Sequence, residues 1–312
     1  SSLPSSTVSS VTYSTCDTYN GIALDSNFSV YVSCMMNNGD ASIQMFSQGS
    51  SSSTAYVNTQ GNSCTPTANT RENRCLKAPE ALIINDDDLY IADSGDTNNG
   101  GTIIKVSQTS GTTVTFAGSG TCSSATFSDY PYDATSYDLC QPTNIAIDPS
   151  TSNLFISDEG RYEILIIIAA TGDLYQLSKG SSSLMYRGLV YANNDLYLNE
   201  IQPQVQLMKL TSKQIQQMID NNSTSLSSPT SVTSLGNIQN VNSMTKDPSK
   251  NVIVMCKCIP CVVYQLLEHL SLYLSEMCLI LLLIISIGNV SDIVIIVIVV
   301  VIVDIIITAL GF

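Results

Sequence analysis

The chain has 312 residues, of which 44% are hydrophobic and only 12% are charged, and its formal net charge is −14. This length allows one large domain or two ordinary ones, and the apolar content is ample for a packed core. Nucleic-acid binding needs clustered Lys and Arg side chains that neutralise phosphates, whereas the twelve basic residues here are scattered. We therefore expect no nucleic-acid partner.

The start of the chain, its cysteines and its glycosylation patterns favour an extracellular, secreted or cell-surface protein. It begins at Ser1 in a Ser/Thr-rich run, which is typical of a chain that has lost a signal peptide or has been trimmed. Several of the ten cysteines fall in turn-rich segments, where free thiols would be exposed, so an oxidising compartment is the simpler interpretation. Three asparagines are candidates for N-glycosylation, Asn27, Asn222 and Asn289, although a Ser-rich chain also matches this pattern by chance.

One short pattern returns along the chain. An apolar-Ala-apolar-Asp run or a close variant is followed by turn residues and by an apolar-aromatic-apolar run that ends on a small or acidic residue. Copies occur at residues 22–32, 89–95 and 145–158, and looser ones at 196–200 and 246–254. The apolar residues alternate with a period of two and stop at turn formers, which predicts β-hairpins. Their repetition predicts a repeat architecture.

The better copies contain further strands. A third strand is predicted at residues 43–46, 102–106 and 205–210, and a fourth at 112–120. Four antiparallel strands in a meander form one blade of a β-propeller, so the chain is predicted to be all-β. The central residues of the second strands are Tyr31, Tyr90, Phe155, Tyr197 and Ile253. Successive ones lie 42 to 65 residues apart, and most of these intervals exceed the ~40 to 50 residues of a compact blade.

Two pairs of cysteines bracket the additional residues: Cys64 with Cys75, and Cys122 with Cys140. Each pair encloses a polar loop just before a new first strand. We predict that both pairs form disulfides that clip these insertions, each stabilising the fold by ~2 to 4 kcal/mol. Unpaired or differently paired thiols are the alternative. Cys16 also lies ahead of a first strand, and its expected partner is Cys34 or a cysteine near the C-terminus.

The link between two of the predicted units carries a family resemblance. Residues 116–121, 127–136 and 139–148 form a glycine-rich run, an Asp-containing loop with Ala-Thr-Ser, and a Pro-led Ile-Ala-Asp strand. This succession resembles the link between consecutive NHL repeats. Residues 89–95 and 103–106 resemble the second and third strands of the same repeat.

The NHL resemblance extends over residues 19–256 and is strongest over 79–160. It implies a β-propeller, which most often has six blades in this family. We therefore expect an NHL-type propeller over residues 1–260. The alternating run at residues 7–13 is a candidate strand for closing the ring.

Aspartates recur at fixed positions in the units. Four of them are predicted to cap turns by accepting backbone N–H groups: Asp25, Asp93, Asp148 and Asp158. Calcium binding is the alternative where several carboxylates share a loop, because Ca²⁺ prefers oxygen ligands. The calcium candidates are Asp86, Asp88, Asp93 and Asp96, although their spacing does not match an EF-hand loop.

No catalytic residues are predicted. NHL-type lyases resemble metal or acid–base enzymes built on several histidines, whereas this chain has one, His269. The run Cys256–Cys261, with His269 and Cys278 beyond it, resembles a metal-ligand cluster, but disulfides suit a secreted chain better. We expect neither a metal nor a cofactor, apart from the calcium alternative.

Residues 261–312 form a separate hydrophobic segment. Residues 277–287 are almost wholly apolar and residues 293–303 are an unbroken Ile/Val run. A bilayer span needs about 20 apolar residues, and joining the two runs would bury Asp292 or Asp304. The segment is consistent with a closing blade, with an assembly strand that inserts into a neighbouring copy, with a membrane or GPI-type tail, or with a shifted reading frame.

These observations favour a non-enzymatic propeller that acts as a structural or adhesion scaffold. Its partners would be proteins or glycans, and also further copies of itself if it assembles into a filament. One alternative is a calcium-dependent propeller hydrolase or lyase. Another is a membrane-anchored receptor ectodomain.

Overall fold

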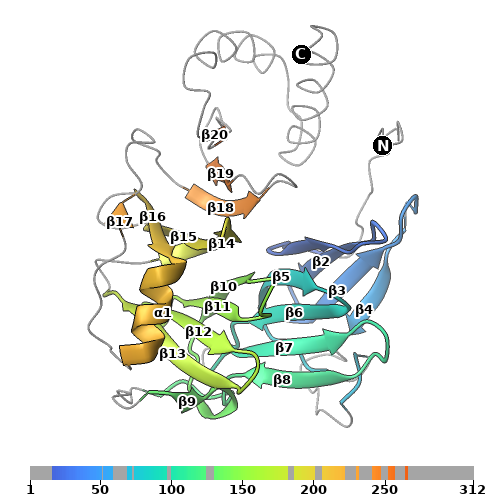
Figure 1. Cartoon of the computed structure of the whole chain (residues 1–312). Helices are drawn as coiled ribbons and strands as arrows, with labels where there is room; N and C mark the ends of the chain where they lie inside the picture. The colour runs from blue at the N-terminus through green and yellow to red at the C-terminus, as the bar shows by residue number, and fades with distance from the viewer. Residues whose placement is uncertain are drawn as a thin grey trace, which may run out of the picture. The chain divides into compact units, whose positions relative to one another are not determined.

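The computed structural model describes residues 16–50, 52–58, 69–71, 74–96, 100–123, 130–181, 186–200, 206–221, 230–231, 241–246, 252–256 and 264–265. All of these described residues belong to one compact unit. Within these residues the chain forms five antiparallel sheets (Figure 1).

The first two sheets are four-stranded meanders in which each strand pairs with the next in sequence. The first contains β1 (Ile22–Leu24), β2 (Val30–Met35), β3 (Ala41–Phe46) and β4 (Thr54–Asn58). The second contains β5 (Pro79–Asn85), β6 (Asp88–Asp93), β7 (Thr102–Ser107) and β8 (Thr113–Ala117). Both contain the repeated strands expected from the sequence.

The third sheet has the same meander and one additional edge strand. Its strands are β10 (Pro142–Ile147), β11 (Leu154–Asp158), β12 (Glu163–Ile168) and β13 (Asp173–Lys179), with β9 (Tyr132–Asp133) paired to the outer side of β13. A short 3₁₀ helix, Ala134–Ser136, follows β9.

The fourth and fifth sheets follow the same order. The fourth contains β14 (Tyr186–Ala192), β15 (Asp195–Glu200), β16 (Gln206–Thr211) and β17 (Thr230–Ser231), and the fifth contains β18 (Val241–Lys246), β19 (Val252–Cys256) and β20 (Tyr264–Gln265). A two-residue turn joins β14 to β15, where Asn193 and Asn194 have φ of 53° and 64°. Asparagine tolerates this left-handed conformation, which hairpin turns require.

Successive sheets contact each other through their first strands: β1 contacts β5, β5 contacts β10, β10 contacts β14, and β14 contacts β18. Apolar side chains fill the spaces between neighbouring sheets. Ile43, Leu89 and Ile104 are fully buried between the first two sheets, and Leu154 and Leu165 are fully buried between the second and third. Meanders that pack face to face in this way form a β-propeller, so the predicted fold class is confirmed.

One helix, α1 (Ser212–Asn221), follows β16 and was not predicted from the sequence (Figure 1). Its start is a capping box, in which Gln214 N donates to Thr211 Oγ1 (3.3 Å) and Thr211 N donates to Gln214 Oε1 (2.9 Å). Ile215 and Met218, three residues apart on one face, are buried in the same apolar cluster as β12 and β16 residues.

Several predictions concern residues outside the described ones: the strand at 7–13, and residues 261–312 apart from β20. Within the described part of the chain, no helix is long and apolar enough to cross a membrane.

Candidate functional site

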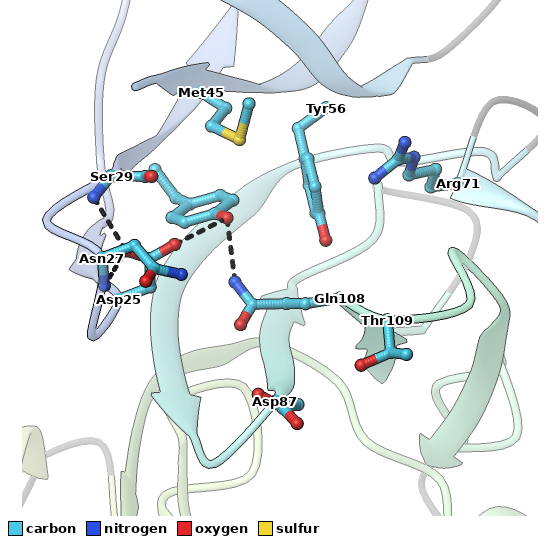
Figure 2. Close-up of a pocket in the computed structure, with 10 residues that line it drawn as sticks. Asp25, Asn27, Ser29, Met45, Tyr56, Arg71, Asp87, Gln108 and Thr109 are labelled. Carbon is cyan, nitrogen blue, oxygen red and sulfur yellow. Dashed lines mark hydrogen bonds between the residues drawn. The ribbon is translucent and has the colours of Figure 1, made fainter. Parts of the chain in front are cut away.

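A pocket of about 400 Å³ lies between the first and second sheets (Figure 2). The first sheet contributes the β1–β2 turn and side chains of β2, β3 and β4. The second contributes the segment before β5 and the β5–β6 and β7–β8 turns. The lining residues are Asp25, Asn27, Ser29, Tyr31, Met45, Tyr56, Arg71, Asp87, Gln108 and Thr109.

Two tyrosine rings form the inner wall of the pocket. Tyr31 on β2 and Tyr56 on β4 meet edge to face, with ring centroids 4.9 Å apart, and the Arg71 guanidinium lies 4.7 Å from the Tyr56 ring centroid. Tyr31 is 3% exposed and Tyr56 is 6% exposed. Burial raises the pKa of both phenols, so both are protonated at neutral pH.

A chain of hydrogen bonds connects the two sheets beside these rings. The Tyr31 hydroxyl donates to Asp25 Oδ2 (3.1 Å) and accepts from Gln108 Nε2 (2.9 Å) in the β7–β8 turn. Asp25 Oδ1 in turn accepts from the backbone N–H groups of Asn27 (2.9 Å) and Ser29 (2.7 Å). Asp25 therefore caps its own turn and orients Tyr31.

The Tyr56 hydroxyl differs from that of Tyr31. It is buried and, among the described residues, has no hydrogen-bond partner. Figure 2 shows it directed toward the side of the pocket where Gln108 and Thr109 lie. A buried hydroxyl without a partner costs about 1–3 kcal/mol, which a bound ligand that supplies a partner would offset.

The remaining lining groups are mixed in character. Asn27, Asp87 and Thr109 contribute an amide, a carboxylate and a hydroxyl, and Met45 contributes an apolar wall. With Arg71 and Tyr56 they offer donors and acceptors within one small volume. Such a set suits a ligand rich in hydroxyl or amide groups.

The four predicted capping aspartates all accept hydrogen bonds, in two different ways. Asp25 and Asp148 cap the turn after the first strand of their own sheet; Asp148 Oδ1 accepts from Ser150 N (2.9 Å). Asp93 and Asp158 end the second strand and are buried. They accept from the backbone just before the first strand of the same sheet: Asp93 from Lys77 N (3.0 Å) and Ala78 N (2.6 Å), and Asp158 from Cys140 N and Gln141 N (both 2.8 Å).

The calcium candidates are not gathered around one point. The Asp88 carboxylate pairs with Lys105 (2.6 Å), the Asp96 carboxylate lies 4.0 Å from Lys77, and Asp86 lies in the β5–β6 turn with φ of 52°. In the part of the chain that the structure describes, no group of three or more His, Cys, Asp or Glu residues has a geometry that could hold a metal ion.

Two disulfides are present among the described residues. Cys122 pairs with Cys140 (Cα–Cα 4.7 Å), as predicted, and Cys16 pairs with Cys34 (Cα–Cα 5.4 Å), one of its two expected partners. Cys75 is also disulfide-bonded. Its predicted partner Cys64, like Asn222, Asn289 and His269, lies outside the described residues.

The sequence did not reveal the pocket. Tyr56, Arg71 and Gln108 belong to three segments that show no shared motif, and only the packing of two sheets brings them together. Asp25 and Tyr31 were recognised, but as a turn cap and as the centre of a repeated strand.

Comparison with protein-family models and with curated protein sequences gives no match. Solved structures do match. A chain of a nidogen/laminin complex has a TM-score of 0.51 at 15% identity, covering 76% of this chain and 72% of that one. A gluconolactonase from Xanthomonas campestris has a TM-score of 0.48 at 13% identity, covering 79% and 72%. At such identities the likeness identifies the fold alone, a β-propeller.

Proposed function

We propose that this chain is a non-enzymatic, NHL-type β-propeller of the extracellular space, where it acts as a structural or adhesion scaffold. In this proposal, the pocket between the first two sheets binds a glycan or the polar surface of a protein partner. The observation that carries it is the buried Tyr56 hydroxyl in a pocket lined by further donors and acceptors.

The chemistry of the pocket supports binding rather than catalysis. The pKa values of the Tyr31 and Tyr56 phenols are raised, so both stay protonated at neutral pH and can offer an O–H to a ligand, but they do not serve as bases. Asp25 already accepts from two backbone N–H groups and from Tyr31. Side chains held in this way orient a ligand without supplying or removing a proton.

The disulfides support an extracellular location, because such bonds persist in oxidising compartments. The rigid meanders support a scaffold role, since loops and turns presented by stable sheets offer wide surfaces for partners. Self-association into a filament is a further form that this scaffold can take.

A binding assay tests the proposal. The secreted full chain is applied to a glycan microarray and to immobilised extracellular-matrix glycoproteins, as wild type and as Tyr56→Phe. We expect wild type to bind a restricted subset of these probes and Tyr56→Phe to bind them at least tenfold more weakly. Because this hydroxyl makes no hydrogen bond of normal geometry to any of the residues that the structure describes, its removal should change the free energy of unfolding little, so a lost signal reports binding.

Tyr175→Phe is the matched control, because Tyr175 on β13 is half-buried and lies outside the pocket. It should bind as wild type does. Absence of binding to every probe, or equal binding by wild type and Tyr56→Phe, would overturn the proposed role of the pocket.

A further inference from the structure

Asn27, Phe28 and Ser29 form an Asn-X-Ser sequence in the turn between β1 and β2. Asn27 and Ser29 also line the pocket between the first two sheets, where Figure 2 shows Asn27 beside Asp25. A possible glycan acceptor therefore lies at the rim of the candidate binding site.

The geometry of the turn presents the acceptor to solvent. Ser26, Asn27 and Phe28 are exposed, and the backbone is held by Asp25, whose carbonyl accepts from Phe28 N (3.1 Å) and whose N–H donates to the Ser29 carbonyl (3.1 Å). The backbone N–H of Asn27 donates to Asp25 Oδ1, and Asn27 itself is exposed. Acceptor asparagines belong to surface turns of this kind.

Phe28 is an unusual residue for its position. It has φ of 60° and is 53% exposed. The corresponding turns of the next three sheets place Asp86, Ser152 and Asn193 in this left-handed conformation, all of them polar. A bulky aromatic residue is disfavoured there, and its exposed ring leaves apolar surface in water. An oligosaccharide on the adjacent Asn27 would lie against this ring and reduce the apolar surface that it exposes.

We propose that Asn27 carries an N-linked glycan, which covers Phe28 and lies at the entrance of the pocket. In the transfer step the amide nitrogen of Asn27 bonds to the anomeric carbon of an oligosaccharide carried on a lipid pyrophosphate. The carbon–oxygen bond to the pyrophosphate breaks, the lipid pyrophosphate leaves with the bonding pair, and the amide loses one proton. This inference rests on the extracellular location in the proposed function. It assigns the Asn27 amide to the glycan, which leaves Tyr56, Arg71, Asp87 and Thr109 as the polar groups that meet a ligand in the pocket.

Occupancy is tested by peptide mapping with mass spectrometry on the full chain secreted from eukaryotic cells. The wild-type peptide containing Asn27 should carry a hexose- and N-acetylhexosamine-containing mass. Ser29→Ala removes the hydroxyl of the Asn-X-Ser sequence but keeps the hydrogen bond from the backbone N–H of residue 29 to Asp25. The Asn27 peptide of this variant should lack the glycan mass. Ser26→Ala, an exposed change in the same turn but outside the acceptor sequence, should keep it.

Coverage of Phe28 has its own readout. Chymotrypsin cleaves after exposed phenylalanines, and a cut here would release two fragments only after reduction, because Cys16–Cys34 spans the turn. Wild type trimmed by an endoglycosidase and unglycosylated Asn27→Gln should both be cut at least fivefold faster than intact wild type. Ser26→Ala should be cut at the wild-type rate.

Recovery of unmodified Asn27 from secreted wild type would overturn the inference, and so would equal cleavage of glycosylated and trimmed protein. These failures are distinct from failure of the proposed function. A secreted chain with unmodified Asn27 leaves the scaffold role intact, whereas a chain that the secretory pathway does not export contradicts the extracellular location itself.

Discussion

Cys34 occupies in β2 the position that Asp93 occupies in β6, three residues after the central tyrosine of each strand. Both residues join the second strand of a sheet to the segment that precedes its first strand. Cys34 does so through its disulfide with Cys16, and Asp93 through hydrogen bonds from the backbone of Lys77 and Ala78. One position in the repeat therefore carries the same connection in covalent and in hydrogen-bonded form.

The covalent form predicts a measurable stabilisation. Replacing both cysteines, as Cys16→Ser/Cys34→Ser, should lower the free energy of unfolding by about 2–4 kcal/mol. The reason is that the disulfide joins residues 18 positions apart and so closes a loop that restricts the unfolded chain. Urea denaturation measures the change. Thiol titration confirms that the Cys122–Cys140 disulfide remains, and an unchanged urea midpoint would contradict the prediction.

The hydrogen-bonded form predicts a similar loss. Asp93→Ala removes the acceptor of two backbone N–H groups at a buried position, so we expect a loss of roughly 2–4 kcal/mol in thermal or urea unfolding. The matched control is Asp96→Ala, three residues later. The Asp96 carboxylate is partly exposed, and its distance of 4.0 Å from Lys77 Nζ makes a long, weak ion pair. The effect of this control variant should stay within about 0.5 kcal/mol, and equal losses for the two variants would argue against a special role for Asp93.

The repeated strands could be predicted because alternation and turn residues are local properties of the sequence. Residues 89–93, for example, form part of β6 as expected. Helix α1 was missed although its signals were present: Thr211 and Gln214 form the capping box, and apolar residues are spaced for one helical face.

The pocket could not be predicted in the same way. Tyr31 and Gln108 are 77 positions apart, and their hydrogen bond exists only because the β7–β8 turn of the second sheet reaches the first. Nothing local marks Tyr56 as a residue whose hydroxyl makes no hydrogen bond to the described part of the chain. Such a site depends on the packing of whole sheets, which a repeat pattern does not specify.

A buried ion network in the third sheet gives a further prediction. Glu163 at the start of β12 accepts from the Tyr137 hydroxyl (2.6 Å) and from Arg161 Nε (3.4 Å), and it pairs with Lys179. Arg161 also donates to the Ser123 carbonyl (2.9 Å). The network therefore attaches the segment that carries the Cys122–Cys140 disulfide to the sheet.

Removing the central carboxylate should be costly. Glu163→Ala leaves the Arg161 guanidinium, which is 8% exposed, without this partner, so we expect a loss of about 3–5 kcal/mol. Lys179→Ala is the control, because its side chain is 49% exposed and its ion pair is screened by water; it should cost less than about 1 kcal/mol. Chemical denaturation measures both, and a smaller loss for Glu163→Ala than for Lys179→Ala would reject this account.

The last prediction concerns the pH dependence of stability at Asp148. Burial alone raises the pKa of this carboxyl, but hydrogen bonds from Ser150, Thr151 and the Tyr191 hydroxyl outweigh it, so the folded pKa lies below the ordinary value. The unfolded chain has an ordinary Asp pKa of about 3.9. Folding therefore favours the charged form, and the resulting stabilisation is complete above the unfolded pKa.

This stabilisation should disappear as the pH falls from about 4 through the folded pKa of Asp148. We expect wild type to be more stable than Asp148→Asn at pH 7 and the difference to shrink steadily in acid, as measured by urea unfolding at a series of pH values. Asp87→Asn, at an exposed position of the β5–β6 turn, should have nearly the same free energy of unfolding as wild type at pH 7. A wild-type advantage over Asp148→Asn that stays constant from pH 7 to pH 3 would show that these hydrogen bonds do not distinguish the charged carboxylate from its neutral form.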